Sequence, residues 1–104
     1  MTEYHVSFTL TDVCHRLQVS ESLCVELVEY GIVSPVGPRP AEWTFDLEML
    51  SSMQRAMRLH RDLELDWSGV ALVTELLDER EQLRRENRIL RRRLSRFVDD
   101  SLTE

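Results

Sequence analysis

The sequence predicts a mainly α-helical protein: a winged helix-turn-helix head with a small β-wing, followed by a long C-terminal coiled-coil helix. Two short amphipathic segments near the start are joined by a turn of a few residues, as in a helix-turn-helix. All three prolines then fall in one loop, which is typical of a turn between two strands. From Val70 to about Val98, neither glycine nor proline interrupts a helical pattern.

A short strand and a short helix are expected at the start of the chain. Residues 4–9 alternate between apolar and polar side chains, which indicates a strand. Thr11 is a good N-cap residue, because its hydroxyl accepts a hydrogen bond from an amide of the first helical turn. We therefore expect the first helix over residues 11–17, with Thr11 at its start.

The second helix, expected over residues 21–30, has the position of a DNA-reading helix. Ser20 is its expected N-cap, and Gly31 follows where a C-cap needs the left-handed conformation. Its apolar side chains recur at helical spacing at Leu23, Leu27 and Tyr30. A helix that reads bases presents Arg, Lys, Asn or Gln to the major groove. The polar positions here are instead Glu21, Ser22, Glu26 and Glu29.

The wing and a third helix are expected next. Ile32 and Val33 begin a second strand, residues 34–42 form the proline-rich loop, and residues 43–45 return as the partner strand. Trp43 and Phe45 are interpreted as core of the wing more readily than as contacts to a partner. Asp46 is the expected N-cap of a third helix that runs to about Glu64.

The long helix carries a heptad repeat that predicts a homodimer. Residues 65–69 break the helical pattern, and Ser68 is the expected N-cap of the long helix. A lone helix of this length is marginal in water, which favours pairing. The expected dimer interface consists of Val73, Leu76, Leu83, Asn87, Leu90, Leu94 and Phe97. A parallel pair would place Glu79 near Arg84 and Glu86 near Arg91 of the partner, but an antiparallel arrangement stays open. The expected domains are a head over residues 1–67, a dimerisation helix over 68–98 and an acidic tail over 99–104.

The charge is distributed very unevenly along the chain. The formal net charge is −6, and the sequence contains no lysine. Residues 1–79 hold five arginines against fourteen acids, whereas residues 80–96 hold eight arginines against two glutamates. An acidic head repels a phosphate backbone and suits a basic protein surface, so we expect no nucleic acid partner. The arginines of residues 84–96 are interpreted as outer positions of the coiled coil. Phosphate binding, or pairing with the other subunit's head, is the alternative.

No motif predicts catalysis, a metal or a cofactor. The sequence has no glycine-rich phosphate loop and no GxSxG, so we expect neither an enzyme nor a small-molecule substrate. The histidines and cysteines lack the spacing of a metal site. Cys14 and Cys24 are expected to be free, buried thiols in a reducing, cytoplasmic compartment. No apolar run approaches a membrane span, and no signal peptide is recognised.

Five segments together resemble the CbpM chaperone-modulator family, and the order of elements resembles the MerR regulators. They are residues 43–46, 54–59, 65–69, 86–91 and 94–98, and the resemblance extends over residues 4–98. It implies a non-enzymatic protein that binds the J-domain of a CbpA-type, DnaJ-like co-chaperone. Such a protein inhibits both the co-chaperone activity and the DNA binding of its partner. The alternatives are a MerR-type DNA-binding transcriptional regulator and a purely structural dimerisation module.

Two acidic clusters are candidates for docking the basic surface of the J-domain, and the sequence does not choose between them. The other interpretation of both clusters is that these charged side chains are simply solvated. In that case Trp67 is buried and anchors the third helix to the long helix. The first cluster lies on the second helix, and the second lies where the third helix ends. The candidate partner-binding residues are Glu21, Glu26 and Glu29 in the first cluster, and Asp62, Glu64 and Asp66 with Trp67 in the second.

Overall fold

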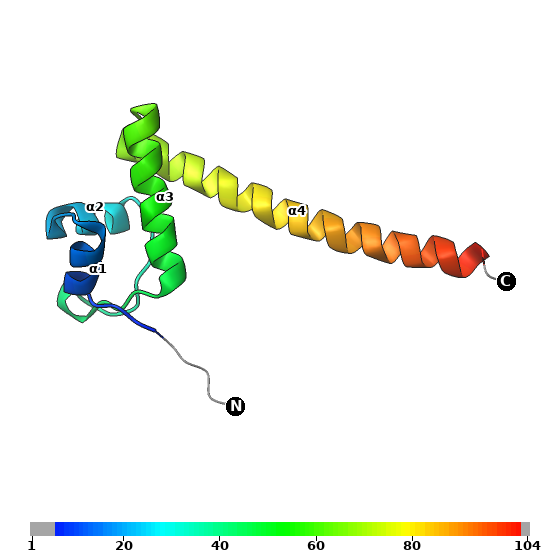
Figure 1. Ribbon diagram of the computed structural model, residues 1–104, viewed down its shortest axis with the longest axis horizontal. Helices are drawn as coiled ribbons and strands as arrows, with labels where there is room; N and C mark the ends of the chain where they lie inside the picture. The colour runs from blue at the N-terminus through cyan, green and yellow to red at the C-terminus, as the bar shows by residue number, and fades with distance from the viewer. Residues whose placement is uncertain (1–5, 103–104) are drawn as a thin grey trace. The chain divides into compact units, whose positions relative to one another are not determined.

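The computed structural model describes residues 6–102 and confirms a mainly helical fold with a helix-turn-helix and a long C-terminal helix (Figure 1). Contacts divide the chain into two units, one that ends at Thr74 and one that begins at Glu75. The elements are, in order, α1 (Leu10–Leu17), α2 (Glu21–Glu29), a short 3-10 helix η1 (Pro40–Glu42), α3 (Leu47–Leu63) and α4 (Trp67–Leu102).

The N-cap of α1 is Thr9, so the expectation of Thr11 was wrong. The Thr9 hydroxyl accepts a hydrogen bond from the Asp12 amide at 3.1 Å, and the Asp12 carboxylate accepts one from the Thr9 amide at 3.0 Å. This is a capping box, which needs an acceptor side chain three residues after the cap. A cap at Thr11 would place Cys14 there instead. The Thr9 amide and then the Thr9 hydroxyl hold the pKa of Asp12 below its ordinary value.

Both ends of α2 follow the sequence prediction. The Ser20 hydroxyl accepts a hydrogen bond from the Leu23 amide at 3.2 Å, which confirms Ser20 as the N-cap. At the other end Gly31 adopts φ +76°, where a side chain would be strained. The Gly31 amide donates to the Val28 carbonyl, and the Ile32 amide donates to the Leu27 carbonyl, each at 3.0 Å. This pair of hydrogen bonds is a Schellman motif, and it ends the helix at Glu29.

The wing contains much less β-structure than expected. Two isolated antiparallel bridges replace the predicted strands: Phe8 pairs with Phe45, and Val36 pairs with Thr44. Residues 4 and 5 of the expected first strand lie outside the described residues, and among residues 6–9 the bridge forms only at Phe8. The expected strand at residues 32–33 does not form, because the Ile32 amide closes α2 and Val33 is buried in the core.

Asp46 caps α3 as predicted, but the junction to α4 differs from the prediction. The Met49 amide donates to the Asp46 carboxylate at 2.8 Å. At the junction the Asp66 carboxylate accepts hydrogen bonds from the Gly69 amide at 2.8 Å and the Ser68 hydroxyl at 3.1 Å. Asp66 is therefore the N-cap of α4, because its carboxylate accepts the hydrogen bond from the Gly69 amide. Ser68 is not the cap, because its hydroxyl donates a hydrogen bond to Asp66 instead of accepting one from a helix amide.

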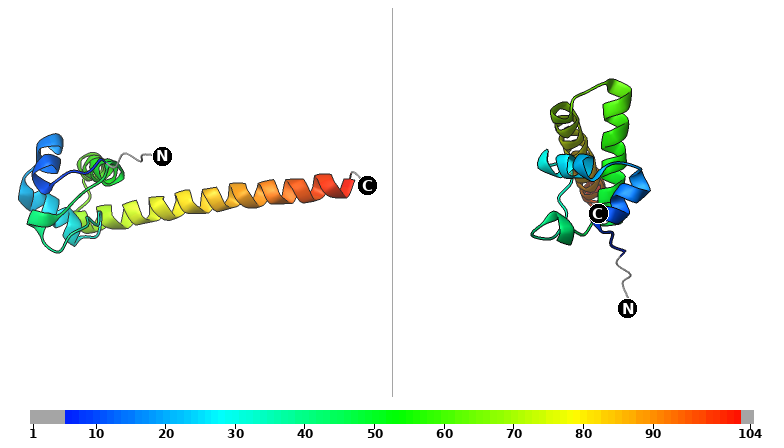
Figure 2. Two further views of the ribbon diagram at one scale, coloured as in Figure 1. Left: turned by 90° about the horizontal axis from the view of Figure 1, so that it is seen from below. Right: turned by 90° about the vertical axis from the view of Figure 1, so that its left-hand side faces the viewer.

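The helix α4 is longer at both ends than the expected helix over residues 70–98. It runs without interruption from Trp67 to Leu102, so that residues 99–102 of the expected acidic tail are helical (Figure 2). Val70 and Thr74 on its first turns are buried, and both belong to the head unit.

The head has one hydrophobic core, to which the helix-turn-helix contributes one face of each helix. Cys14 of α1 and Cys24 of α2 are free thiols whose sulfur atoms lie 3.3 Å apart. Cys24 is fully buried, whereas Cys14 is partly exposed. Burial, followed by the hydrogen bond with Cys14, raises the pKa of Cys24 to about 12. The buried members of this core cluster are Phe8, Leu10, Val13, Cys24, Leu27, Val33, Phe45, Leu50 and Met53.

We predict that the protein loses stability in alkaline solution through Cys24. The pKa of this thiol is about 12 in the folded chain, against 9.0 ordinarily, so the unfolded chain releases the proton first as the pH rises. The free energy of unfolding is unaffected by Cys24 below about pH 9 and should then fall, by at most about 1.4 kcal/mol per pH unit. The absence of lysine leaves few other groups to titrate there. Urea denaturation at several pH values would measure the slope. Cys24→Ala should flatten it, and parallel slopes in both proteins would contradict the assignment.

A second prediction separates the two possible caps of α4. Asp66→Ala should lower the free energy of unfolding by about 1 kcal/mol, because the Gly69 amide loses its acceptor. Ser68→Ala should lower it by less, since the Ser68 hydroxyl only donates to Asp66. Urea denaturation followed by circular dichroism would compare the two variants, and a larger loss in Ser68→Ala would show that the cap is misassigned.

Candidate functional site

One face of α2 forms a shallow acidic hollow on the head. Ser22, Glu26, Glu29 and Tyr30 line this hollow, which we call the α2 acidic face. The opposite side of the helix is fixed in the core by Cys24 and Leu27, neither of which is exposed. On the side away from the core, Glu29 is exposed and Glu26 is half-buried. The structure therefore brings together Glu26 and Glu29, two of the three predicted acids of α2, while Glu21 does not line the hollow.

Tyr30 is the residue of this face that the sequence interpretation missed. Its spacing from Leu27 assigned it to the apolar stripe of the helix, but 45% of the side chain is exposed. The helix ends at Glu29, and Tyr30 is its C-cap. Tyr30 keeps right-handed helical angles, and its amide donates to the Glu26 carbonyl at 3.0 Å. The signal that could have found it is its spacing of four residues from Glu26, which places the two side chains on one face.

The charges of α2 are unfavourable for the helix itself. The helix contains Glu21, Glu26 and Glu29 and no basic residue, and its last turn carries no cation. Carbonyl groups at the C-terminal end of a helix make that end negative, and an anion there is disfavoured by about 0.3–1 kcal/mol. Glu26 and Glu29 lie toward this end. A cationic partner surface would relieve that repulsion, which is a physical reason to regard the face as a binding surface.

The second predicted cluster, around the α3–α4 junction, divides into two kinds of residue. Asp66 caps α4, and Trp67 packs against the core and stacks on His60 with ring centroids 4.0 Å apart. Both residues thus have structural roles. Asp62 and Glu64 are exposed, and the Asp62 carboxylate accepts a hydrogen bond from the neighbouring Arg61 at 3.0 Å. Asp62 and Glu64 are therefore the part of the cluster that is available to a partner.

The wing aromatics lie in the core, as the sequence interpretation favoured. Phe45 is buried, and Trp43 packs edge-to-face against it at a centroid distance of 6.2 Å. These two side chains stabilise the head and do not form an exposed aromatic platform.

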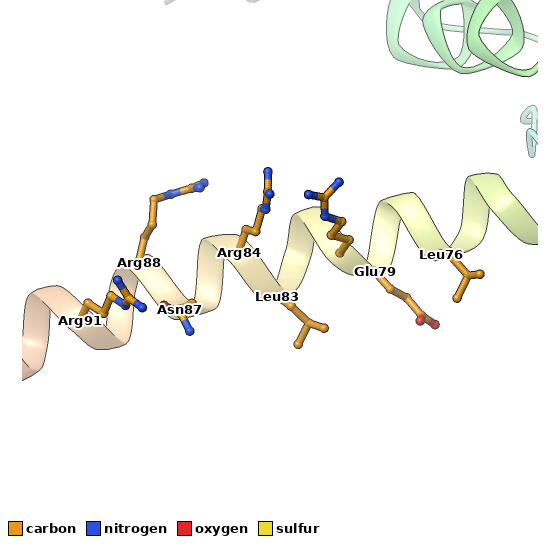
Figure 3. Close-up of a pocket in the computed structure, with 8 residues that line it drawn as sticks. Leu76, Glu79, Leu83, Arg84, Asn87, Arg88 and Arg91 are labelled. Atoms are coloured by element: carbon orange, nitrogen blue, oxygen red, sulfur yellow. The ribbon is translucent and has the colours of Figure 1, made fainter. Parts of the chain in front are cut away.

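An exposed apolar row follows the predicted heptad seam along the second unit of the chain. Leu76, Leu83 and Asn87 point to one side of α4, whereas Arg84 and Arg88 point away from them (Figure 3). The row continues to Phe97, which is 69% exposed. Val73, the first residue of the predicted interface, is half-buried. The exposed seam residues are Leu76, Leu83, Asn87, Leu90, Leu94 and Phe97.

Neither a metal site nor a membrane span is found in the described part of the chain. Among residues 6–102, no three or more His, Cys, Asp or Glu side chains are grouped so that they could hold a metal ion. No helix in the same range combines the length and the apolar character that crossing a bilayer requires.

Comparison with known proteins identifies the family. Residues 8–92 match the family described as MerR HTH family regulatory protein. The chaperone modulatory protein CbpM of Pseudomonas entomophila is 47% identical over 93 residues, which cover 89% of this chain and 92% of that protein. CbpM of Citrobacter koseri is 43% identical over 98 residues, 94% of this chain and 97% of that protein. The chain belongs to the CbpM family. The resemblance inferred from the five sequence segments is confirmed, and so is the MerR-like character of the fold.

The CbpM relatives are named for a modulatory role, and they match this chain over nearly its whole length. A third relative, CbpM of Pseudomonas putida, is 44% identical over 93 residues. The matched MerR region contains both the helix-turn-helix and most of α4. In this chain, therefore, the scaffold of a DNA-reading regulator is combined with an acidic second helix.

Proposed function

We propose that the protein is a non-enzymatic, cytoplasmic chaperone modulator that binds the J-domain of a CbpA-type co-chaperone and inhibits its co-chaperone and DNA-binding activities. The observation that carries the proposal is the α2 acidic face, where Glu26 and Glu29 flank the exposed Tyr30. Membership of the CbpM family supplies the class of partner. The two free thiols support a reducing compartment.

The inhibition follows from competition for one cationic surface. J-domains of the CbpA type present a basic second helix to the Hsp70 chaperone, and the acidic face has the complementary charge. Charge complementarity accelerates the encounter, while a desolvated aromatic side chain contributes most to the lifetime of a complex. Glu26 and Glu29 supply the first contribution, and Tyr30 supplies the second.

The same charges argue against the DNA-binding alternative. A regulator that grips DNA neutralises phosphates with arginine or lysine, and the recognition helix contributes to this. Here α2 contains three carboxylates and no cation. The helix has the fold and position of a DNA-reading element, but its charge repels a phosphate backbone.

We also propose that two copies pair through the seam of α4 to form a homodimer. The support is the row of exposed apolar side chains at heptad spacing, of which Leu83 is 64% and Leu90 is 62% exposed. Pairing would remove this apolar surface from water at roughly 25 cal/mol per Å². Asn87 lies at an a position, where a buried amide selects register and the number of strands.

We predict that the double reversal Glu26→Arg/Glu29→Arg weakens capture of the J-domain by about tenfold or more. Close charge pairs across an interface contribute about 1.5 kcal/mol or more, and 1.4 kcal/mol is a factor of ten in affinity. Isothermal titration calorimetry with the isolated J-domain would measure the change. Glu29 is exposed, and Glu26 is half-buried on the side of α2 away from the core, so thermal unfolding should show an intact head.

The matched control is Asp62→Arg/Glu64→Arg, which makes the same change in net charge on the other candidate cluster and leaves the Asp66 cap in place. Loss of binding only in this control would move the docking site to the α3–α4 junction. If neither pair matters, the electrostatic account is wrong. Affinity for duplex DNA that falls steeply with added salt would support a DNA-binding regulator instead.

For the dimer, we predict that Leu83→Ala with Leu90→Ala converts a dimer into monomers at micromolar concentration. Truncation of a buried leucine costs about 2–5 kcal/mol per site, and each substitution occurs in both copies. Analytical ultracentrifugation would measure the mass in solution. Ile89→Ala is the control, since Ile89 is also exposed on α4 but lies off the seam, and it should stay dimeric. A monomeric wild-type protein would refute the proposal.

A further inference from the structure

The two cysteines face each other across the helix-turn-helix. Cys14 belongs to α1 and Cys24 to α2, ten positions further along the chain, and their sulfur atoms are 3.3 Å apart. A disulfide bond is about 2.05 Å long, so bond formation requires the two sulfurs to approach by only about 1.2 Å.

The two thiols differ in their surroundings, and this difference sets the order in which they react. Cys14 is partly exposed, so a small oxidant can reach its sulfur, whereas Cys24 is fully buried. Burial raises the pKa of Cys24 to about 12, so this thiol keeps its proton and does not react with an oxidant itself. Cys14 is therefore the residue that reacts first, and Cys24 is in place to resolve the product.

We propose that Cys14 and Cys24 form a reversible dithiol–disulfide site, which a hydroperoxide oxidises within one chain so that α1 becomes covalently joined to α2. In the first step the Cys14 sulfur, as thiolate, attacks the O–O bond of the hydroperoxide. A sulfur–oxygen bond forms, the O–O bond breaks, and the departing oxygen leaves as water or an alcohol after protonation. The product is a sulfenic acid at Cys14.

In the second step the Cys24 sulfur attacks the Cys14 sulfur. The S–S bond forms, the S–O bond breaks, and the proton of the Cys24 thiol leaves with the oxygen as a second molecule of water. Two electrons pass in total from the two thiols to the hydroperoxide. A dithiol reductant reverses the reaction by thiol–disulfide exchange. The cross-link closes only a short loop, which contains the turn and the Ser20 cap of α2.

The test is oxidation of the reduced, folded, full-length protein with hydrogen peroxide, followed by mass spectrometry under non-reducing conditions. We expect the mass of two hydrogen atoms to be lost, both thiols to become unreactive toward alkylation in denaturant, and dithiothreitol to restore both. Arg16 lies between the two cysteines, so trypsin should release two peptides that stay joined until they are reduced. Retention of both thiols, a link between chains only, or addition of oxygen to Cys14 without a link would overturn the proposal.

Two further measurements show whether the disulfide forms because the fold holds Cys14 and Cys24 together. Oxidation in concentrated guanidinium chloride should form the intrachain link more slowly than in the folded protein, and an equal or faster rate in denaturant would overturn the proposal. Cys24→Ala should accumulate oxygen on Cys14 with no loss of hydrogen, because the resolving thiol is gone. Cys14→Ala should leave Cys24 reduced. The wild-type peptide map decides the question even if either variant fails to fold.

Discussion

Burial of one face of α2 is the constraint on which the rest of the head depends. Cys24 and Leu27 are completely removed from solvent, and the caps at Ser20 and Gly31 fix where the helix starts and stops. Successive residues of a helix are rotated by about 100°, so the two buried residues also determine the directions in which the other side chains of α2 point. Glu29 lies outward and is exposed, and Glu26 lies on the same side of the helix, half-buried. In a DNA-reading protein the same rotation would direct cations into the major groove, and here it presents carboxylates.

The sequence predicted the helix ends that depend on one nearby residue, and it failed where two residues share the task. Ser20 and Asp46 were assigned correctly, because each accepts a hydrogen bond from an amide three residues ahead. The same rule predicted Thr11 as the cap of α1, which was wrong. A capping box also needs a carboxylate three residues after the cap, and Asp12 accepts that hydrogen bond from the Thr9 amide. Ser68, the expected cap of α4, donates its hydroxyl to Asp66, and it is Asp66 that accepts from the Gly69 amide. The bridge between Phe8 and Phe45 joins distant segments, which a local pattern of alternation does not encode.

The candidate site shows the same division between local and non-local information. The acidic character of α2 could be recognised from composition and helical spacing alone. Tyr30 could not, because it lies three residues after Leu27 and four after Glu26, so spacing alone fits both the apolar stripe and the acidic face, and its exposure depends on how the head packs. At the α3–α4 junction, composition grouped Trp67 with Asp62 and Glu64. The stacking of Trp67 on His60 and its packing against the core separate it from them, and these contacts depend on the fold.

The proposed capture of a partner and the proposed oxidation of the thiols both involve α2. This helix has nine residues, and an isolated helix of that length is not stable in water, so its helical state depends on packing against α1 and the rest of the core. The sulfur of Cys24 lies on the packed face, while the exposed Glu29 and the half-buried Glu26 line the hollow on the other side. An interaction that strengthens the contact between α1 and α2 therefore stabilises the helix that carries the acidic face, although it does not change the side chains of that face. Ordering a surface in advance reduces the entropy lost on binding, so the packing on one side of α2 controls the affinity available on the other.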